Sequence, residues 1–196
     1  WFDEAWSASQ ARDALTPIGV FIGINHDNNH HLNSLWMQMV GFGAWPPLVR
    51  LLSILSSSAA ILVAARIAEP RGRITMVATA LLFAFSPMLV TMGSEARGYA
   101  GMSLAMLIAI LFIDRWLAGD LGYRRPTTFA LCFFLGALSQ LTMIFAAVAL
   151  VGWPSFVLWK RNGFRAAALE IFRTFWLPVL VLAGVLGFVL AAGHFA

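Results

Sequence analysis

Polar and hydrophobic positions divide the chain into a mixed opening segment and a long apolar remainder. Residues 1–45 combine polar, acidic and aromatic side chains, whereas uncharged runs dominate residues 46–196. Helical spacing in the opening segment predicts one helix that ends before Thr16-Pro17. A polar run follows and is predicted to end in an Asn helix cap. A second, amphipathic helix is then predicted to close at Gly41, with an apolar face made of Leu32, Leu35, Trp36, Met39 and Val40. We expect that face to lie in the membrane interface.

The apolar remainder predicts six membrane-spanning helices. Their boundaries are about 46–66, 74–92, 96–116, 126–140, 142–159 and 174–193. The second run is 19 uncharged residues long, enough to cross a bilayer. Ser86-Pro87 should kink its far end, because proline cannot continue a regular helix.

The uncharged run 126–159 could form one helix or two. A single helix of 34 residues would be about 51 Å long, against a hydrocarbon core of roughly 30 Å. Two helices broken near Ser139-Gln140-Leu141-Thr142 would bring ten basic residues to one side, as the cytoplasmic enrichment in Lys and Arg favours. These ten are Arg66, Arg71, Arg73, Arg115, Arg124, Arg125, Lys160, Arg161, Arg165 and Arg173. We therefore predict two helices, with Gln140 on the outer side.

Composition supports an all-α, polytopic transmembrane bundle with juxtamembrane helices in an outer loop. The 196 residues are 60% hydrophobic and 11% charged, well below the charged fraction of soluble domains, about 25%. The net charge of +4 reflects cytoplasmic loops rather than nucleic-acid binding, since no basic stripe interleaved with aromatics is present. Because residue 1 is Trp and the last helix has no tail, we expect a fragment of a longer membrane protein, preceded by a further helix.

Two charged clusters on the predicted outer side are candidates for chemistry. Asp3 and Glu4 could serve as a general base for a hydroxyl, or could simply favour the dipole of an interfacial helix. Ser94 and Glu95 suit the cap and first turn of the third span. Arg97 opposes the helix dipole there, so it needs a carboxylate partner or a bound phosphate.

Histidines in the opening segment leave a metal site open. His26, Asp27 and His30 could coordinate a metal ion, since His30 lies four residues after His26. The alternative is an ordinary Asn-rich loop. Gln140 is expected to make either a helix–helix hydrogen bond or a substrate contact.

The order of these motifs resembles a known family of membrane glycosyltransferases. The residues concerned are Asp3-Glu4, Asn29-His30-His31-Leu32-Asn33-Ser34-Leu35, Arg50-Leu51, Ser86-Pro87 and Ser94-Glu95-Ala96-Arg97-Gly98-Tyr99-Ala100. They look like the protein O-mannosyltransferase and aminoarabinose transferase superfamily, nearest the bacterial branch of rhizobial lipopolysaccharide galacturonosyltransferases. The resemblance covers about residues 1–160. His31 stands where members often have Pro, and Ser139-Gln140 where they often have a pair such as Thr-His.

The resemblance implies a GT-C fold and transfer of a sugar from a polyprenyl phosphate to a lipid, glycan or protein acceptor. It implies that Asp3 and Glu4 activate the acceptor or bind a divalent metal ion, no cofactor being certain. Arg97 would lie near the lipid phosphate, and the further substrate-binding candidates are Glu95, Tyr99, His30 and Arg50. The implied location is the bacterial inner membrane, with the active face periplasmic or extracellular. The alternatives are a non-catalytic carrier or transporter of polyprenyl-linked lipids, and a structural subunit.

Overall fold

The computed structural model describes residues 2–22 and 30–194, with the backbone alone at residues 2–3 and 193–194. The described part contains helices and no strand, and 85% of the protein is helical, which confirms the expectation of an all-α fold. In chain order the elements are α1 (Phe2–Asp13), α2 (Gly19–Ile22), α3 (His31–Val40), α4 (Pro46–Val49), α5 (Leu51–Ala68), η1 (Glu69–Arg71), α6 (Arg73–Phe85), α7 (Pro87–Ser94), α8 (Tyr99–Leu117), η2 (Leu121–Tyr123), α9 (Pro126–Ser139), α10 (Met143–Asn162) and α11 (Phe164–His194).

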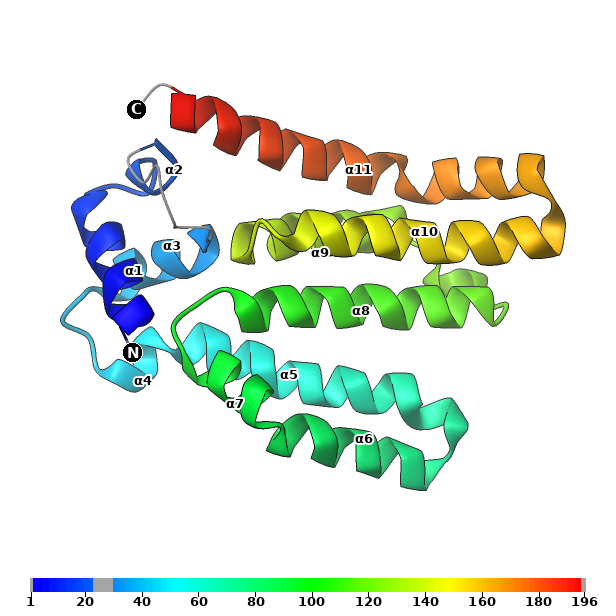
Figure 1. Cartoon of the computed structure of the whole chain (residues 1–196), viewed down its shortest axis with the longest axis horizontal. Helices are drawn as coiled ribbons and strands as arrows, with labels where there is room; N and C mark the ends of the chain where they lie inside the picture. The colour runs from blue at the N-terminus through cyan, green and yellow to red at the C-terminus, as the bar shows by residue number, and fades with distance from the viewer. Residues whose placement is uncertain (1, 23–29, 195–196) are drawn as a thin grey trace.

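The long helices run side by side, and the short helices of the opening segment gather at one end of them. Figure 1 shows α5, α6, α8, α9, α10 and α11 as the body of the bundle, with α1 to α4 beyond its left end. The connection between α7 and α8 and the break between α9 and α10 also lie at that end. Segments far apart in the sequence therefore meet there.

Four helices of the described part are long and apolar enough to cross a membrane. They lie in α5, α8, α10 and α11, and the bent pair α6–α7 would be a fifth. The fourth predicted span, 126–140, corresponds to α9 within one residue, but its 14 residues give about 21 Å of helix against a hydrocarbon core of roughly 30 Å. The helices are thus compatible with a multi-pass membrane protein.

Two predicted interruptions occur at the expected residues. The chain bends by 59° between α6 and α7. Ser86 at the bend is extended, with ψ 116°, because the ring of a following proline disfavours the helical conformation. Gln140 separates α9 from α10 and is also extended, with φ −157° and ψ 121°. The run 126–159 is therefore two helices.

The reversals on the opposite side of the bundle lie together at its right end in Figure 1. They comprise η1, η2 and the turn at Gly163, around which most of the ten basic residues are placed. Gly72 and Gly163 reverse the chain with positive φ angles of 108° and 80°, which glycine adopts without steric cost. This grouping agrees with the predicted division of charge, and the compartment it faces stays a prediction.

The last helix begins at Phe164, ten residues before the predicted start of the span at about residue 174. The prediction placed Arg165 and Arg173 in a loop before that span. They belong instead to an amphipathic first half, in which Ala167, Ile171 and Phe175 follow four-residue spacing and pack against the core.

Aromatic side chains fill the core between α8, α9 and α11. The ring of Phe175 lies 5.0 Å from Phe129, 6.4 Å from Phe133 and 6.3 Å from Trp116, measured between centroids. Each aromatic side chain removes a large apolar area from its surroundings and favours such tilted contacts. A separate small cluster of Ala11, Met37 and Ala96 joins α1, α3 and the α7–α8 connection, and so it fixes the end of the bundle at which the polar residues meet.

Candidate functional site

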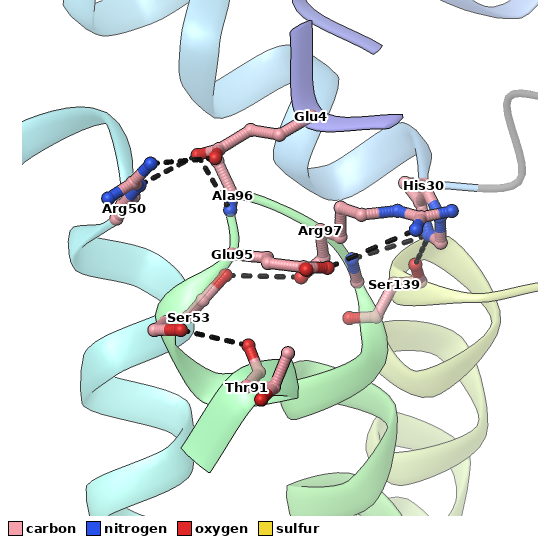
Figure 2. A network of polar contacts seen from close by, with 11 residues as sticks. Glu4, His30, Arg50, Ser53, Thr91, Glu95, Ala96, Arg97 and Ser139 are labelled. Atoms are coloured by element: carbon pink, nitrogen blue, oxygen red, sulfur yellow. Dashed lines mark hydrogen bonds and ion pairs between the residues drawn. The ribbon is translucent and has the colours of Figure 1, made fainter. Parts of the chain in front are cut away.

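The polar residues singled out in the sequence meet at the end of the bundle where α1 to α4 gather. Figure 2 shows Glu4, His30, Arg50 and Arg97 converging on the connection between α7 and α8. This connection comprises residues 95–98. Ser94 and Glu95 were expected to cap and begin the third span, but Ser94 ends α7 and α8 starts only at Tyr99. Glu95 and Arg97 therefore belong to a loop and not to a first helical turn.

Glycine allows this loop to approach the end of α9 very closely. A Cβ at Gly98 would lie 1.5 Å from the carbonyl oxygen of Ser139. A Cβ at Gly101, one turn further along, would lie 2.5 Å from Ser139 Oγ. No larger residue fits at Gly98 unless one of the two backbones moves, and so glycine at this position has a steric reason.

Glu4 ties three segments together. Its two carboxylate oxygens accept hydrogen bonds from Arg50 Nε at 2.8 Å and Arg50 Nη2 at 2.7 Å, and Oε1 also accepts from the backbone N–H of Ala96 at 3.2 Å. The Glu4 side chain is 14% exposed. A bidentate pair of this kind is among the stronger ion pairs in proteins. Glu4 thus links α1 to the start of α5 and to the α7–α8 connection.

These contacts keep Glu4 ionised. Burial of Glu4 raises its pKa, but the hydrogen bonds from Arg50 and Ala96 and the charge of Arg50 outweigh burial and leave the pKa lowered. The same hydrogen bond to Glu4 raises the pKa of Arg50. A carboxylate with a lowered pKa and both oxygens engaged is a weak base, so the site assigns Glu4 a structural role. The side chain of Asp3, the other half of the predicted acidic pair, lies outside the described residues.

Arg97 lies beside three kinds of side chain: an imidazole, an aromatic ring and a carboxylate. Its Nε donates to His30 Nε2 at 3.3 Å, and its guanidinium carbon lies 4.9 Å from the centroid of the Tyr99 ring. Nη1 lies 3.9 Å from Glu95 Oε2, an ionic contact that is too long for a hydrogen bond. The side chain is 18% exposed. Arg97 is therefore a cation held between an imidazole and an aromatic face at the mouth of the bundle.

Three groups lie within hydrogen-bond distance of the His30 ring: Arg97 Nε at Nε2, and the Ser139 carbonyl oxygen and the backbone nitrogen of Gly98 at Nδ1. A guanidinium has no acceptor, so Nε2 of His30 must accept the hydrogen from Arg97. In that tautomer the proton of the neutral imidazole resides on Nδ1 and is donated to the carbonyl oxygen of Ser139 at 3.3 Å, so the backbone N–H of Gly98, also 3.3 Å from Nδ1, contacts that atom without a hydrogen bond. Burial and the charge of Arg97 lower the pKa of His30 to about 4. His30 is consequently neutral at physiological pH.

The backbone carbonyl of Arg97 is held by Ser53, which is itself held by Asn33. Ser53 Oγ donates to the carbonyl oxygen of Arg97 at 3.1 Å, and Asn33 Nδ2 donates to Ser53 Oγ, also at 3.1 Å. Ser53 is 1% exposed and Asn33 2% exposed. Sequence reasoning missed both residues. The polar positions of α3 and the serine in the first turn of α5 were the available signals.

The helix α3 turns its polar positions toward the protein, and the predicted apolar face, which we expect to meet the membrane interface, is the more exposed one. The buried residues of α3 are His31, Asn33, Ser34 and Met37, whereas Met39 of the predicted apolar face is 71% exposed. The predicted Asn cap is wrong, because His30 occupies the N-cap position and makes no side-chain cap. The His30 ring points toward Ser139 and Arg97 instead. The polar face of α3 thus packs on the site.

Of the three predicted metal ligands, the structure describes only His30. Among the described residues, no group of three or more His, Cys, Asp or Glu side chains could hold a metal ion. His26 and Asp27 lie outside the described residues. Both ring nitrogens of His30 face other groups, an Arg cation at Nε2 and a carbonyl oxygen at Nδ1. A metal ion bound to His30 would have to displace one of these groups, and the metal site itself stays a prediction.

Two buried polar atoms near the site have no hydrogen-bond partner within the described part of the chain. They are His31 Nδ1 and Gln140 Oε1, so the expected helix–helix hydrogen bond through Gln140 Oε1 is not formed. The His31 ring stacks on Phe21 with centroids 5.1 Å apart and planes 4° from parallel. Phe21 in turn lines an apolar groove of about 710 Å³ between α9 and α11.

No protein-family model, curated protein or solved structure matches the chain. The function is therefore argued from the site.

Proposed function

We propose that the protein is a membrane glycosyltransferase that moves a sugar from a polyprenyl phosphate to an acceptor lipid, glycan or protein. The active end is the end where α1 to α4 gather, and we propose that it faces the periplasm or exterior from a bacterial inner membrane. The motif order in the sequence motivates the reaction class. The placement of Arg97 is the observation that supports it best.

Arg97 is suited to a lipid phosphate for three reasons. It is a permanent cation at the end of an apolar bundle, and its guanidinium geometry matches phosphate oxygens. It precedes the 19-residue helix α8, whose N-terminal amides favour anions. The nearby groove of about 710 Å³ is lined by apolar residues and could hold a prenyl chain. Phe21 at this groove stacks on His31, the neighbour of the Arg97 partner His30.

The reaction needs a base at the acceptor and a cation at the leaving group. The acceptor hydroxyl oxygen forms a bond to the anomeric carbon of the sugar, while the bond from that carbon to the phosphate oxygen breaks. The hydroxyl proton passes to the base, and the electron pair leaves with the polyprenyl phosphate. Arg97 would stabilise the charge that develops on the phosphate. Asp3 is the candidate base, because Glu4 is engaged with Arg50 and Ala96.

Transfer by variants of the two carboxylates tests this assignment. Membranes containing the full-length protein are given labelled polyprenyl-phosphate sugars, and the label transferred to acceptor is measured. We expect Asp3→Asn to lower the transfer rate by about a hundredfold or more at unchanged protein level. Glu4→Gln should lower the amount of folded protein instead. Unchanged transfer in both variants and in the double variant would remove both residues from the reaction.

A carrier or transporter of polyprenyl-linked lipids is the second candidate, favoured by the bend of 59° between α6 and α7. Broken helices are common at transport sites. A hollow of about 910 Å³ lined by Ser86 and Pro87 accompanies the bend. Movement of a labelled polyprenyl phosphate across proteoliposomes, without any sugar transfer, would favour this candidate over the transferase.

A further inference from the structure

We infer that α3 and its N-cap residue form a positioning element for Arg97, in which His30 orients the guanidinium and Asn33 anchors the main chain through Ser53. The task given to Arg97 rests on the proposed function, whereas the positioning itself rests on the contacts around Arg97. Neither His30 nor Asn33 would touch the reacting atoms in this arrangement. Their effect on phosphate binding would pass through Arg97.

His30 contacts Arg97 at Nε, the atom through which the guanidinium is attached to the rest of the side chain. The guanidinium is planar, and Nε carries one hydrogen in that plane. With Nε directed at His30 Nε2 at 3.3 Å, rotation about the last side-chain bonds is restricted. The two terminal nitrogens, which present the fork to a phosphate, then have a defined direction.

His30 can act this way because it is itself fixed. It is 2% exposed, its Nδ1 donates to the carbonyl oxygen of Ser139, and its ring meets the Tyr99 ring edge-on at 5.1 Å. Tyr99 also lies under the guanidinium, 4.9 Å from its central carbon. Imidazole, phenol ring and guanidinium therefore form one packed unit across α3, α8 and the end of α9.

The Asn33–Ser53 pair fixes the base of the same side chain. It holds the carbonyl oxygen of Arg97 within the connection 95–98, which lies between the end of α7 and the start of α8. Asn33 and Ser53 are both almost completely buried. A buried polar pair of this kind is costly unless its hydrogen bonds are made, which agrees with a role in holding the loop.

Two isosteric replacements of His30 separate positioning of Arg97 from simple anchoring of α3. The amide of His30→Gln reaches the place of Nε2 and can still accept from Arg97. The amide of His30→Asn reaches the place of Nδ1 and can still donate to Ser139. The readout is the rate at which p-hydroxyphenylglyoxal modifies Arg97 in the full-length protein, followed by mass spectrometry of the peptide that contains it. His31→Phe is the matched control, since it keeps the stack on Phe21 and does not touch Arg97.

We expect His30→Asn to raise the modification rate of Arg97 by about tenfold, the effect of losing a hydrogen bond to a charged group. His30→Gln and His31→Phe should stay within about twofold of the parent protein. The inference is overturned if His30→Gln raises the rate and His30→Asn does not, or if both leave it unchanged.

A second pair of variants keeps the inference testable should the His30 variants fold poorly. Ser53→Ala and Asn33→Ala should each raise the modification rate, whereas Gln38→Ala on the same helix, which loses only contacts to Ala11 and Thr16, should not. Equal rates in all three variants would contradict the inference. Adding a polyprenyl phosphate to the parent protein then tests the proposed function separately: protection of Arg97 supports phosphate binding, and its absence counts against the transferase without altering the variant pattern.

Discussion

At the scale of single residues, the neighbouring contacts decide which polar groups can do chemistry. Glu4 accepts three hydrogen bonds from Arg50 and Ala96. Its carboxylate therefore stabilises the contact between these segments. Arg97 lies against His30 and Tyr99, with Glu95 at 3.9 Å. Two arginines that look equivalent in the sequence, Arg50 and Arg97, therefore have different surroundings.

Glu4→Gln should destabilise the protein. An amide cannot form the charged bidentate pair with Arg50, and we expect a loss of about 1–2 kcal/mol, modest because Arg50 is 30% exposed. The measurement is the thermal midpoint of the purified protein in detergent. Asp13→Asn changes an exposed acid of the same helix and should leave the midpoint unchanged. Equal shifts in the two variants would contradict the account of Glu4.

Stability should fall as the pH decreases from about 6.5 to about 4, because of His30. Its pKa is lower in the folded protein, about 4, than the ordinary value of 6.5. Between about pH 6.5 and 4, His30 therefore binds a proton in the unfolded chain but not in the folded protein, and so protonation favours unfolding. The shift corresponds to at most about 3 kcal/mol. The pKa of Glu4 is lowered as well, so its contribution is lost only below about 4.5.

Thermal midpoints across this pH range check the assignment. His30→Gln should flatten the dependence between pH 6.5 and 4. His31, whose pKa burial also lowers, contributes in the same window, so His31→Phe measures its share. An unchanged slope in His30→Gln would show that another group titrates.

At the scale of elements, the site depends on how closely the α7–α8 connection approaches the end of α9. Gly98→Ala would place a Cβ 1.5 Å from the Ser139 carbonyl oxygen, and the loop that carries Arg97 would have to move. We expect a loss of roughly 1–3 kcal/mol, typical of overpacking, together with loss of sugar transfer. Gly152→Ala meets nothing within 4 Å, so it should be neutral or stabilising in the same thermal assay. If both alanines are tolerated equally, the close approach at Gly98 is not as described.

Several elements could be predicted from the sequence because their causes are local. The bend at Ser86-Pro87 follows from proline geometry, and the end of α3 at Gly41 follows from a glycine at the cap, with φ 88°. The break at Gln140 has no such local mark, and only the distribution of ten basic residues predicted it.

What the sequence could not provide are contacts between distant residues. His30 and Ser139 are 109 positions apart, and Ser53 and Arg97 are 44 apart. No periodicity encodes such pairs. The apolar face of α3 predicted a helix beside the membrane, but it did not predict that Asn33 and His31 on the other face would pack inward near the site. The early start of α11 was missed for the opposite reason, since its charges lie on an exposed face.

At the scale of the whole molecule, the fold separates a basic end from the end that holds the site. Ser94 and Thr142 are exposed at the site end, whereas Asp120 and Asn162 are exposed at the basic end. Single cysteines at these four positions, with Cys132 replaced, should divide into two pairs when intact cells are treated with a membrane-impermeant maleimide. Ser94→Cys and Thr142→Cys should be modified from outside, and Asp120→Cys and Asn162→Cys should be protected. Modification of Thr142→Cys from the same side as Asn162→Cys would contradict the two-helix arrangement of residues 126–159.

The most direct test of the central claim compares sugar transfer by two arginine variants. Arg97→Gln removes the cation proposed to meet the lipid phosphate. Arg12→Gln removes a different cation, which belongs to the opening segment and lies over the Phe42 ring, 5.5 Å from its centroid. No role in sugar transfer is proposed for Arg12. Initial rates of transfer from a labelled polyprenyl-phosphate sugar should fall by about a hundredfold in Arg97→Gln and stay within about twofold in Arg12→Gln. Equal rates in the parent protein and Arg97→Gln would contradict the claim.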